Sequence, residues 1–128
     1  MKYLLDTNVI VEHLRGKKEI DVSLIKKGSA ISVISQAELY YGIHKSKKLT
    51  QNLRKIKQML EDLRIGIIHF NEDILNVYGM LKVNLETKGQ RLDEFDLLIA
   101  ATALSADLTL VTKNKKHFQR VPQLKLLS

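Results

Sequence analysis

The stretch YLLDTNVI, residues 3–10, decides the fold of this chain because it joins a short apolar run directly to a helix start. Residues 2–5 have the composition of a buried strand. Asp6, Thr7 and Asn8 are residue types that cap helices, and the apolar positions of a helix follow at Val9 and Ile10. A strand that leads straight into a helix, with no hairpin turn between them, indicates a crossover unit of a parallel sheet.

The same strand-to-helix order recurs along the chain. Further strands are predicted at residues 30–34, 65–70, 108–112 and 124–127, and helices at about 19–26, from 35 onward, at 49–64, from 71 onward and at 95–106. Alternation throughout the length argues for a parallel sheet with helices on both faces. We therefore predict an α/β fold, a three-layer α/β/α sandwich with a central, mostly parallel four- to five-stranded sheet.

Composition limits the possible classes of function. The length of 128 residues suits a single domain spanning residues 1–128, and 45% hydrophobic with 27% charged residues is typical of a globular chain with a packed core. A net charge of +7 favours a polyanionic partner such as nucleic acid, without identifying it. The absence of cysteine excludes disulfides, thiolate nucleophiles and cysteine-based zinc sites.

No segment has the pattern of a targeting or membrane sequence. The N-terminal apolar run is too short for a signal peptide, and no later run approaches the ~20 apolar residues of a membrane span. We expect a cytoplasmic protein with no membrane partner.

Two acids stand where predicted strands pass into helices, the edge at which open parallel sheets form their sites. Asp6 is either the cap of its helix or, since Thr7 and Asn8 could cap it equally well, available for a functional role. Glu38 either closes a capping box with Ser35 or points from the first helical turn into the crevice near Asp6.

Two further acids begin the apolar helix at 95–106. Asp93 suits the cap position, and Asp96 stands in the first turn between Phe95 and Leu97. An ionised carboxylate on a helix that is apolar nearly all round needs a cation or several hydrogen-bond donors. A bound metal would meet that need.

A polar group also follows the predicted strand at 108–112. Thr112 ends that strand, and Asn114 is either a turn residue or a fourth ligand or water-positioning group. Mg²⁺ and Mn²⁺ prefer oxygen ligands and keep several waters, so a cluster of carboxylates and one amide suits them better than zinc.

Four motifs in this order resemble the PIN domain family: LLDTNVI (4–10), SVISQAELYYGI (32–43), FDLLIAATAL (95–104) and LVTKNKKHF (110–118). Within that family the chain most resembles the VapC-type toxins of prokaryotic toxin–antitoxin pairs, over essentially its whole length. The resemblance implies a Mg²⁺- or Mn²⁺-dependent endoribonuclease that hydrolyses RNA phosphodiester bonds with a metal-activated water.

The resemblance also assigns roles to residues. Asp6, Glu38 and Asp96 match the family's three acids, and Asn114 matches its variable fourth position, with His117 where some relatives carry an acid. It implies that Asp6 and Asp96 bind the metal directly and that Glu38 binds through water or acts as general base. The supporting residues it implies are Thr7, Ser35, Asp93 and Thr112.

Partners follow from the resemblance and from the charge. RNA is the expected substrate, held by basic residues that otherwise form a solvated surface: Lys45, Lys47, Lys48, Arg54, Lys113, Lys115, Lys116 and Arg120. A cognate antitoxin and a homodimer are implied, and the apolar stripe of residues 49–63 is the expected place for partner contacts. The alternative is a non-catalytic RNA-binding protein whose acids only cap helices.

Overall fold

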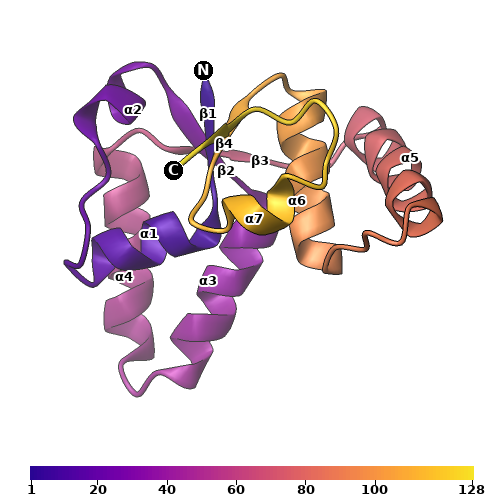
Figure 1. The fold of residues 1–128 in the computed structure, drawn as a ribbon. Coiled ribbons are helices and arrows are strands. Elements are labelled where there is room, and N and C mark those ends of the chain that lie inside the picture. Colours follow the sequence, from indigo (N-terminus) through magenta and orange to yellow (C-terminus); the bar gives the residue numbers. More distant parts are fainter.

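Five short parallel strands form the sheet at the centre of the molecule (Figure 1), in a computed structural model that describes all of residues 1–128. They are β1 (Tyr3–Leu5), β2 (Ser29–Ser32), β3 (Gly66–Ile68), β4 (Thr109–Val111) and β5 (Leu126–Leu127). Their order in the sheet is β3-β2-β1-β4-β5, and every pairing is parallel. The opening stretch thus supplies the central strand, and the prediction of a mostly parallel sheet is confirmed.

Seven helices connect these strands. They are α1 (Thr7–Leu14), α2 (Val22–Lys26), α3 (Val33–Lys45), α4 (Leu49–Asp62), α5 (Glu72–Thr87), α6 (Glu94–Ser105) and α7 (Lys115–Phe118). None of them combines the length and the apolarity needed to cross a lipid bilayer.

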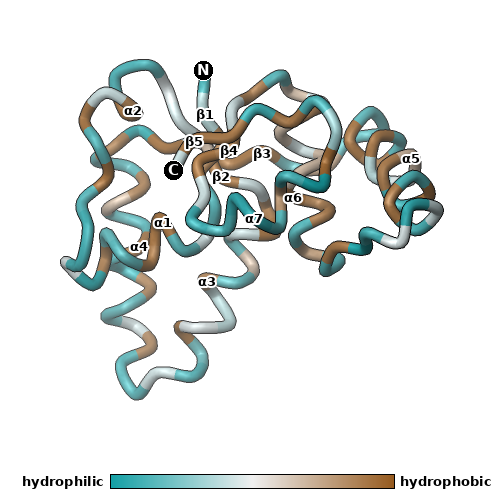
Figure 2. The backbone as a smooth tube through the Cα atoms, viewed as in Figure 1, coloured by the Kyte–Doolittle hydropathy of each residue, from teal (hydrophilic) through white to brown (hydrophobic).

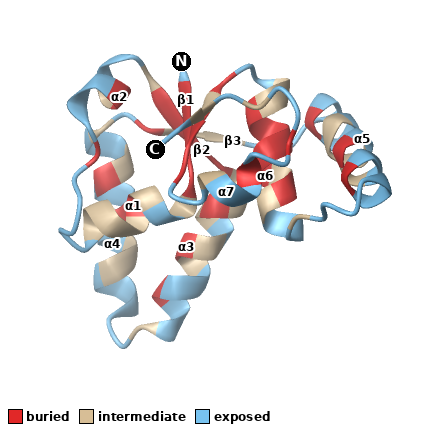
Figure 3. Ribbon diagram, viewed as in Figure 1, coloured by how far each residue is buried: buried red, intermediate tan, exposed pale blue.

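The central strands β1 and β2 are buried on both faces, which makes the molecule three layers deep. In β1, Leu4 packs into a core formed with α5, α6 and the segment around Phe118, while Tyr3 and Leu5 pack into a second core with α1 to α4. Figure 2 shows the strands as an apolar centre, and Figure 3 shows the buried residues on the helix sides that face it. The predicted α/β/α sandwich is confirmed. A one-residue slip of β1 would exchange its faces, so its register is firmly specified.

Three helix starts decide how the acids are used. Asp6 caps α1, because its side chain accepts from the Thr7 backbone N–H at 2.8 Å, and Asp93 caps α6 in the same way through Phe95 at 3.2 Å. The alternative caps of α1 are therefore wrong. Ser32 caps α3 by accepting from the Ile34 N–H at 3.0 Å.

Of the two readings of Glu38, the capping box with Ser35 is wrong, for a local reason. The strand ends earlier than expected, at Ser32, and this serine is already a good cap, so Ser35 lies inside the helix and is fully buried. The helix predicted from residue 19 likewise begins only at Val22, because Asp21 caps it through the Ser23 N–H. Glu38 is thereby released from a capping role.

Candidate active site

The carboxyl ends of β1, β2 and β4 lie next to one another, since these strands are parallel neighbours in the sheet. In Figure 1 this edge is the lower one, where α1 and α3 begin. It brings Asp6, the first turns of α3 and Thr112 to one place, although they are more than 25 residues apart in the sequence. Open parallel sheets form their sites at this edge.

Asp6 is held in one orientation by donors on both of its carboxylate oxygens. It is only 5% exposed; Oδ1 accepts from the Thr7 N–H and Oδ2 accepts from the Thr112 hydroxyl, each at 2.8 Å. Thr112 Oγ1 in turn accepts from the Asn114 N–H at 3.0 Å. Thr112 therefore links the end of β4 to Asp6.

Glu38 is oriented by a chain of hydroxyl groups. Thr7 Oγ1 lies 2.6 Å from Glu38 Oε1 and 2.9 Å from Ser35 Oγ. Because the carboxylate only accepts and Thr7 has a single hydroxyl proton, Thr7 donates to Glu38 and Ser35 donates to Thr7. These contacts join α1 to α3 and fix the Glu38 carboxylate beside the end of β1.

Asp96 is held differently, because no protein group donates a hydrogen bond to its half-buried carboxylate. Its pKa is raised from 3.8 to about 6, mainly by burial and also by the negative charges of Asp6, Asp93 and Glu38, while His117 acts in the opposite direction. Each of these charged side chains must therefore lie near Asp96. The site is therefore one electrostatic unit with an excess of negative charge.

No lysine or arginine neutralises that excess. The three ion pairs of the molecule are Lys82–Glu94, Lys113–Glu12 and Lys125–Asp107, and none of them involves a carboxylate of the site. Converging carboxylates without a countercharge are the environment that a divalent cation stabilises.

The donor set fits Mg²⁺ or Mn²⁺, whose ligands are oxygens, better than zinc. Asp6, Glu38 and Asp96 would hold the ion, and Asp96 has both oxygens free of protein hydrogen bonds. No three acidic or histidine side chains are yet spaced as a finished ligand set. Binding would thus require the carboxylates to draw closer together.

The fourth position differs from the others. Asn114 stands at the cap of α7 with an exposed side chain that makes no capping hydrogen bond, and only its backbone reaches the site, through Thr112. His117, one helical turn later, is the α7 side chain whose charge acts on Asp96. The signal in the sequence that could have indicated this role of His117 is its three-residue spacing from Asn114, which places both residues on one face of a helix.

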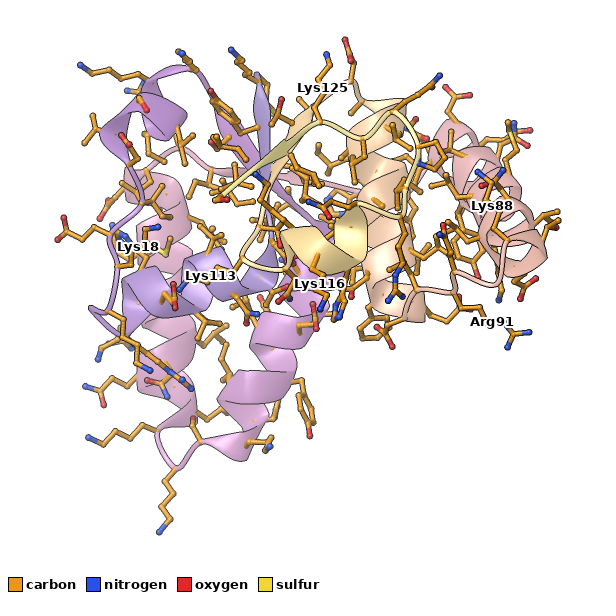
Figure 4. All side chains as sticks on the ribbon, in the orientation of Figure 1. Lys18, Lys88, Arg91, Lys113, Lys116 and Lys125 are labelled. Atoms are coloured by element: carbon orange, nitrogen blue, oxygen red, sulfur yellow. The ribbon has the colours of Figure 1, made fainter.

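Most of the predicted RNA-binding cations fall into two groups, apart from Arg54 on α4 and Lys113, which follows β4. Lys45, Lys47 and Lys48 lie at the turn between α3 and α4, and Lys115, Lys116 and Arg120 lie on or just after α7. Figure 4 places Lys113 and Lys116 on the side of the acidic edge and Lys125 at the opposite end of the sheet.

Two of these cations already have partners within the chain. Lys113 is paired with Glu12 of α1, and the Arg120 guanidinium donates to the Arg91 carbonyl at 2.8 Å. In the α7 group, the side chains of Lys115 and Lys116 make neither an ion pair nor a hydrogen bond within the chain.

Comparison with known proteins identifies the family of the chain. The family model described as PIN domain matches residues 3–124. Ribonuclease VapC2 of Rickettsia felis is 41% identical, over 97% of this chain and 95% of the relative. The tRNA(fMet)-specific endonuclease VapC of Salmonella typhimurium is 28% identical, over 98% of this chain and 96% of the relative.

A solved structure shows the same fold at similar identity. A chain of VapBC2 from Rickettsia felis, bound to a DNA fragment from their promoter, superposes with a TM-score of 0.90 at 40% identity, covering 99% of this chain and 98% of that one. The order of the motifs, the parallel sheet and the length of the chain thus all agree with those of these relatives. This chain belongs to the PIN domain family and, within it, to the VapC ribonucleases.

Proposed function

We propose that this chain is a Mg²⁺- or Mn²⁺-dependent endoribonuclease that acts in the cytoplasm as the toxin of a toxin–antitoxin pair. The observation that carries the proposal is the convergence of Asp6, Glu38 and Asp96 at one sheet edge, where none of the three forms an ion pair with a lysine or arginine. Membership of the VapC ribonucleases supports RNA as the substrate.

Each acid has a distinct role in this proposal. Asp6, fixed by two donors, is the anchor for the ion, and Asp96 completes the binding once it has lost its proton. When bound, the ion lowers the pKa of the attacking water and offsets charge on the phosphate that is cleaved. Glu38, oriented by Thr7, is placed to accept a proton at Oε2, since Oε1 already accepts from the hydroxyl.

Asp93, Asn114 and His117 surround this centre. The Asp93 carboxylate caps α6 and adds negative charge beside Asp96. Asn114 is exposed at the cap of α7, where its amide is free to meet substrate. We assign all three to positioning and charge balance, with Asn114 as the proposed fourth member of the site.

RNA must approach a site that repels it, so cations around the acids are required. Lys115, Lys116 and Arg120 are proposed to bind the phosphates next to the cleaved bond, and the cations at the α3–α4 turn to bind more distant ones. The Salmonella relative named for tRNA(fMet) makes structured RNA the first substrate to test. Binding should weaken steeply with salt, because phosphate contacts release counterions.

The antitoxin is proposed to bind a groove between α1, α3 and α4. Its volume is about 290 Å³, and its lining includes the apolar side chains of Leu39, Ile43 and Ile56 together with Glu38. Ile56 belongs to the apolar stripe in which partner contacts were predicted. A segment seated there would reach the site and block it. We also propose that the toxin is a homodimer, as its resemblance to VapC-type toxins implies.

The central experiment is cleavage of a labelled tRNA with Mg²⁺ or Mn²⁺, with EDTA, and with the variants Asp6→Asn and Asp96→Asn. The matched control is Asp107→Asn, since Asp107 is highly exposed and precedes β4, at the edge of the sheet opposite to the one that carries the acids. We expect cleavage by the wild type and the control only, and only with the metal.

Two outcomes would sink parts of this proposal. Cleavage that survives EDTA or both site substitutions removes the metal mechanism. Binding of RNA with no cleavage under any condition favours the non-catalytic alternative, in which the acids serve only as caps.

A further inference from the structure

One of the two adjacent tyrosines on α3 is exposed beside the acids. Tyr40 packs against the core on the side of α1 to α4, whereas Tyr41 is 66% exposed. Tyr41 follows Glu38 by three residues, so the two side chains are neighbours on the surface of the helix. The residue one turn before Tyr41 is Ala37, which is exposed and too small to cover an aromatic ring. The Tyr41 ring is therefore open to solvent one helical turn from a carboxylate of the site.

A lysine accompanies this ring. Lys45 follows Tyr41 by four residues, and its ammonium group lies 5.2 Å from the centre of the ring. Glu38, Tyr41 and Lys45 thus form one line along α3, which covers about 10 Å of the helix axis. A carboxylate, an aromatic ring and a cation in this order suit a cleaved phosphate, the adjoining base and the next phosphate of an RNA strand.

A second exposed aromatic ring stands beside another acid. Phe95 lies in the first turn of α6, directly before Asp96, and is 46% exposed. The chain has four tyrosines and three phenylalanines, and among these only Tyr41, Phe70 and Phe95 are exposed. Two of these three stand within three residues of a carboxylate of the site. Because burial does not account for their positions, a ligand of the site is the better explanation.

Tyr41 faces away from the groove proposed for the antitoxin. Leu39 and Ile43 of α3 line that groove, and Tyr41 takes no part in it. With 3.6 residues per turn, residues two positions apart point to nearly opposite sides of a helix. In Figure 1, α3 runs downward from the edge that carries the acids, and its far end leads into the lysine-rich turn before α4. The Tyr41 side of α3 therefore suits a polyanion that also reaches the acids.

We propose that Tyr41 and Phe95 are the residues on which RNA bases stack beside the cleaved bond, with Lys45 contacting the phosphate next to the base on Tyr41. This rests on the proposed function and deepens it by giving the bases of the substrate a binding surface. Aromatic rings stack on unpaired bases of any sequence, and a cation beside the ring strengthens the binding site. The acids then act on a phosphate whose neighbouring bases are unpaired.

The first test uses the absence of tryptophan from the chain. Tyr41→Trp and Phe95→Trp each introduce a single tryptophan, whose fluorescence a stacked base quenches. Val22→Trp is the matched control, since Val22 is 64% exposed on α2, which precedes β2 and lies toward the opposite edge of the sheet (Figure 1). Each variant is titrated at low salt with an adenine oligoribonucleotide of about ten nucleotides, in EDTA so that the RNA stays intact. We expect quenching at positions 41 and 95 and none at position 22.

Inorganic polyphosphate separates stacking from charge, because it carries phosphates without bases. It should displace labelled RNA from the protein but leave the fluorescence of the tryptophan at position 41 or 95 unchanged. Quenching by polyphosphate as strong as that by RNA would show that charge alone alters the fluorescence, and would overturn the stacking role.

The affinity for labelled RNA, measured by fluorescence anisotropy, tests how much the ring contributes to binding. Tyr41→Ala should weaken binding by about 5- to 150-fold, as expected when a ring that stacks on one base is removed. Tyr41→Phe and the control Val22→Ala should bind like the wild type. Because Tyr41 is exposed and alanine is the better helix former, the melting temperature of Tyr41→Ala should not fall. A Tyr41→Ala variant that binds RNA like the wild type overturns the proposal and leaves a protein partner as the occupant of this face.

The stacking surface and the nuclease can fail independently of each other. RNA that binds and is cleaved, but quenches neither tryptophan, removes the stacking role and leaves the nuclease in place. Quenching without cleavage after addition of Mg²⁺ or Mn²⁺ supports the stacking surface and removes the nuclease. Absence of RNA binding to the wild type at low salt overturns the stacking role, whatever the cleavage assay shows.

Discussion

The β1–α1 junction and the start of α6 each place an acid at the same edge of the sheet, but they treat it in opposite ways. At the junction, Asp6 is buried and both of its oxygens accept hydrogen bonds. At the start of α6, Asp96 accepts none from the protein, and burial beside other acids raises its pKa to about 6.

The two acids therefore play different parts: Asp6 is a carboxylate fixed by the chain, whereas ionised Asp96 depends on a cation. The Asp6 carboxylate has its partners in the chain and stays in place whether or not an ion is bound. The Asp96 carboxylate lacks partners, so its ionised form is costly until a cation arrives. The chain itself does not stabilise the ionised Asp96 carboxylate, and a bound divalent cation would supply that stabilisation.

The largest expected effect is on cleavage. Asp6→Asn and Asp96→Asn should each lower the rate constant for RNA cleavage by more than about 100-fold, which exceeds the 10- to 100-fold typical of losing a group that only supports a ligand. Single-turnover cleavage with Mg²⁺ measures this. Full activity of Asp96→Asn would contradict the proposed difference between the two acids, because Asp96 would then have no role in cleavage.

A smaller loss is expected when Asp6 keeps its charge but loses a donor. Thr112→Val removes the hydroxyl that donates to Asp6 Oδ2 and should lower cleavage by about 10- to 100-fold. Thr109→Val, in the same strand but away from the site, is the control and should retain full activity. A raised metal concentration should recover part of the Thr112→Val loss; no recovery would indicate a purely structural role.

Stability should respond with opposite signs at the two acids. Asp6→Ala removes the cap of α1 and leaves the Thr112 hydroxyl without its acceptor, so it should lower the free energy of unfolding by about 1–3 kcal/mol. Asp96→Asn removes a destabilised charge and should raise the melting temperature in EDTA at pH 7 to 8. Melts followed by circular dichroism decide this, and destabilisation by Asp96→Asn would contradict the account.

The smallest effect is the pH dependence of that gain. The pKa of Asp96 is raised from its ordinary 3.8 to about 6, so the ionised form costs stability at pH above about 6, and the cost disappears as the pH falls toward 3.8. The advantage of Asp96→Asn over wild type should therefore shrink between pH 6 and pH 4. A constant advantage across this range would show that charge is not its cause.

Much of the fold was predictable because its signals are local. Each strand is an apolar run followed by a helix-capping residue, and this pattern repeats often enough to require parallel crossovers. The boundary of α3 failed because Ser32 and Ser35 are both good caps, and only the end of the pairing between β2 and β3 decides between them. The local sequence does not indicate at which residue the pairing of a strand with its neighbour ends.

The candidate site was predictable only in its acids. Asp6, Glu38 and Asp96 stand at positions that the topology brings to one edge, so their types and order suffice. The hydroxyl chain from Ser35 through Thr7 to Glu38 depends on side-chain contacts between α1 and α3, 28 to 31 residues apart.

The central claim, that Asp96 joins Asp6 in holding a divalent ion, is tested most directly by calorimetric titration of Mn²⁺ into the protein without RNA at pH 7.5. Wild type and Asp107→Asn should bind with the same affinity, while Asp96→Asn should bind at least about tenfold more weakly, the lower end of what altering a metal site costs. Equal affinity of Asp96→Asn and wild type for Mn²⁺ would contradict the account.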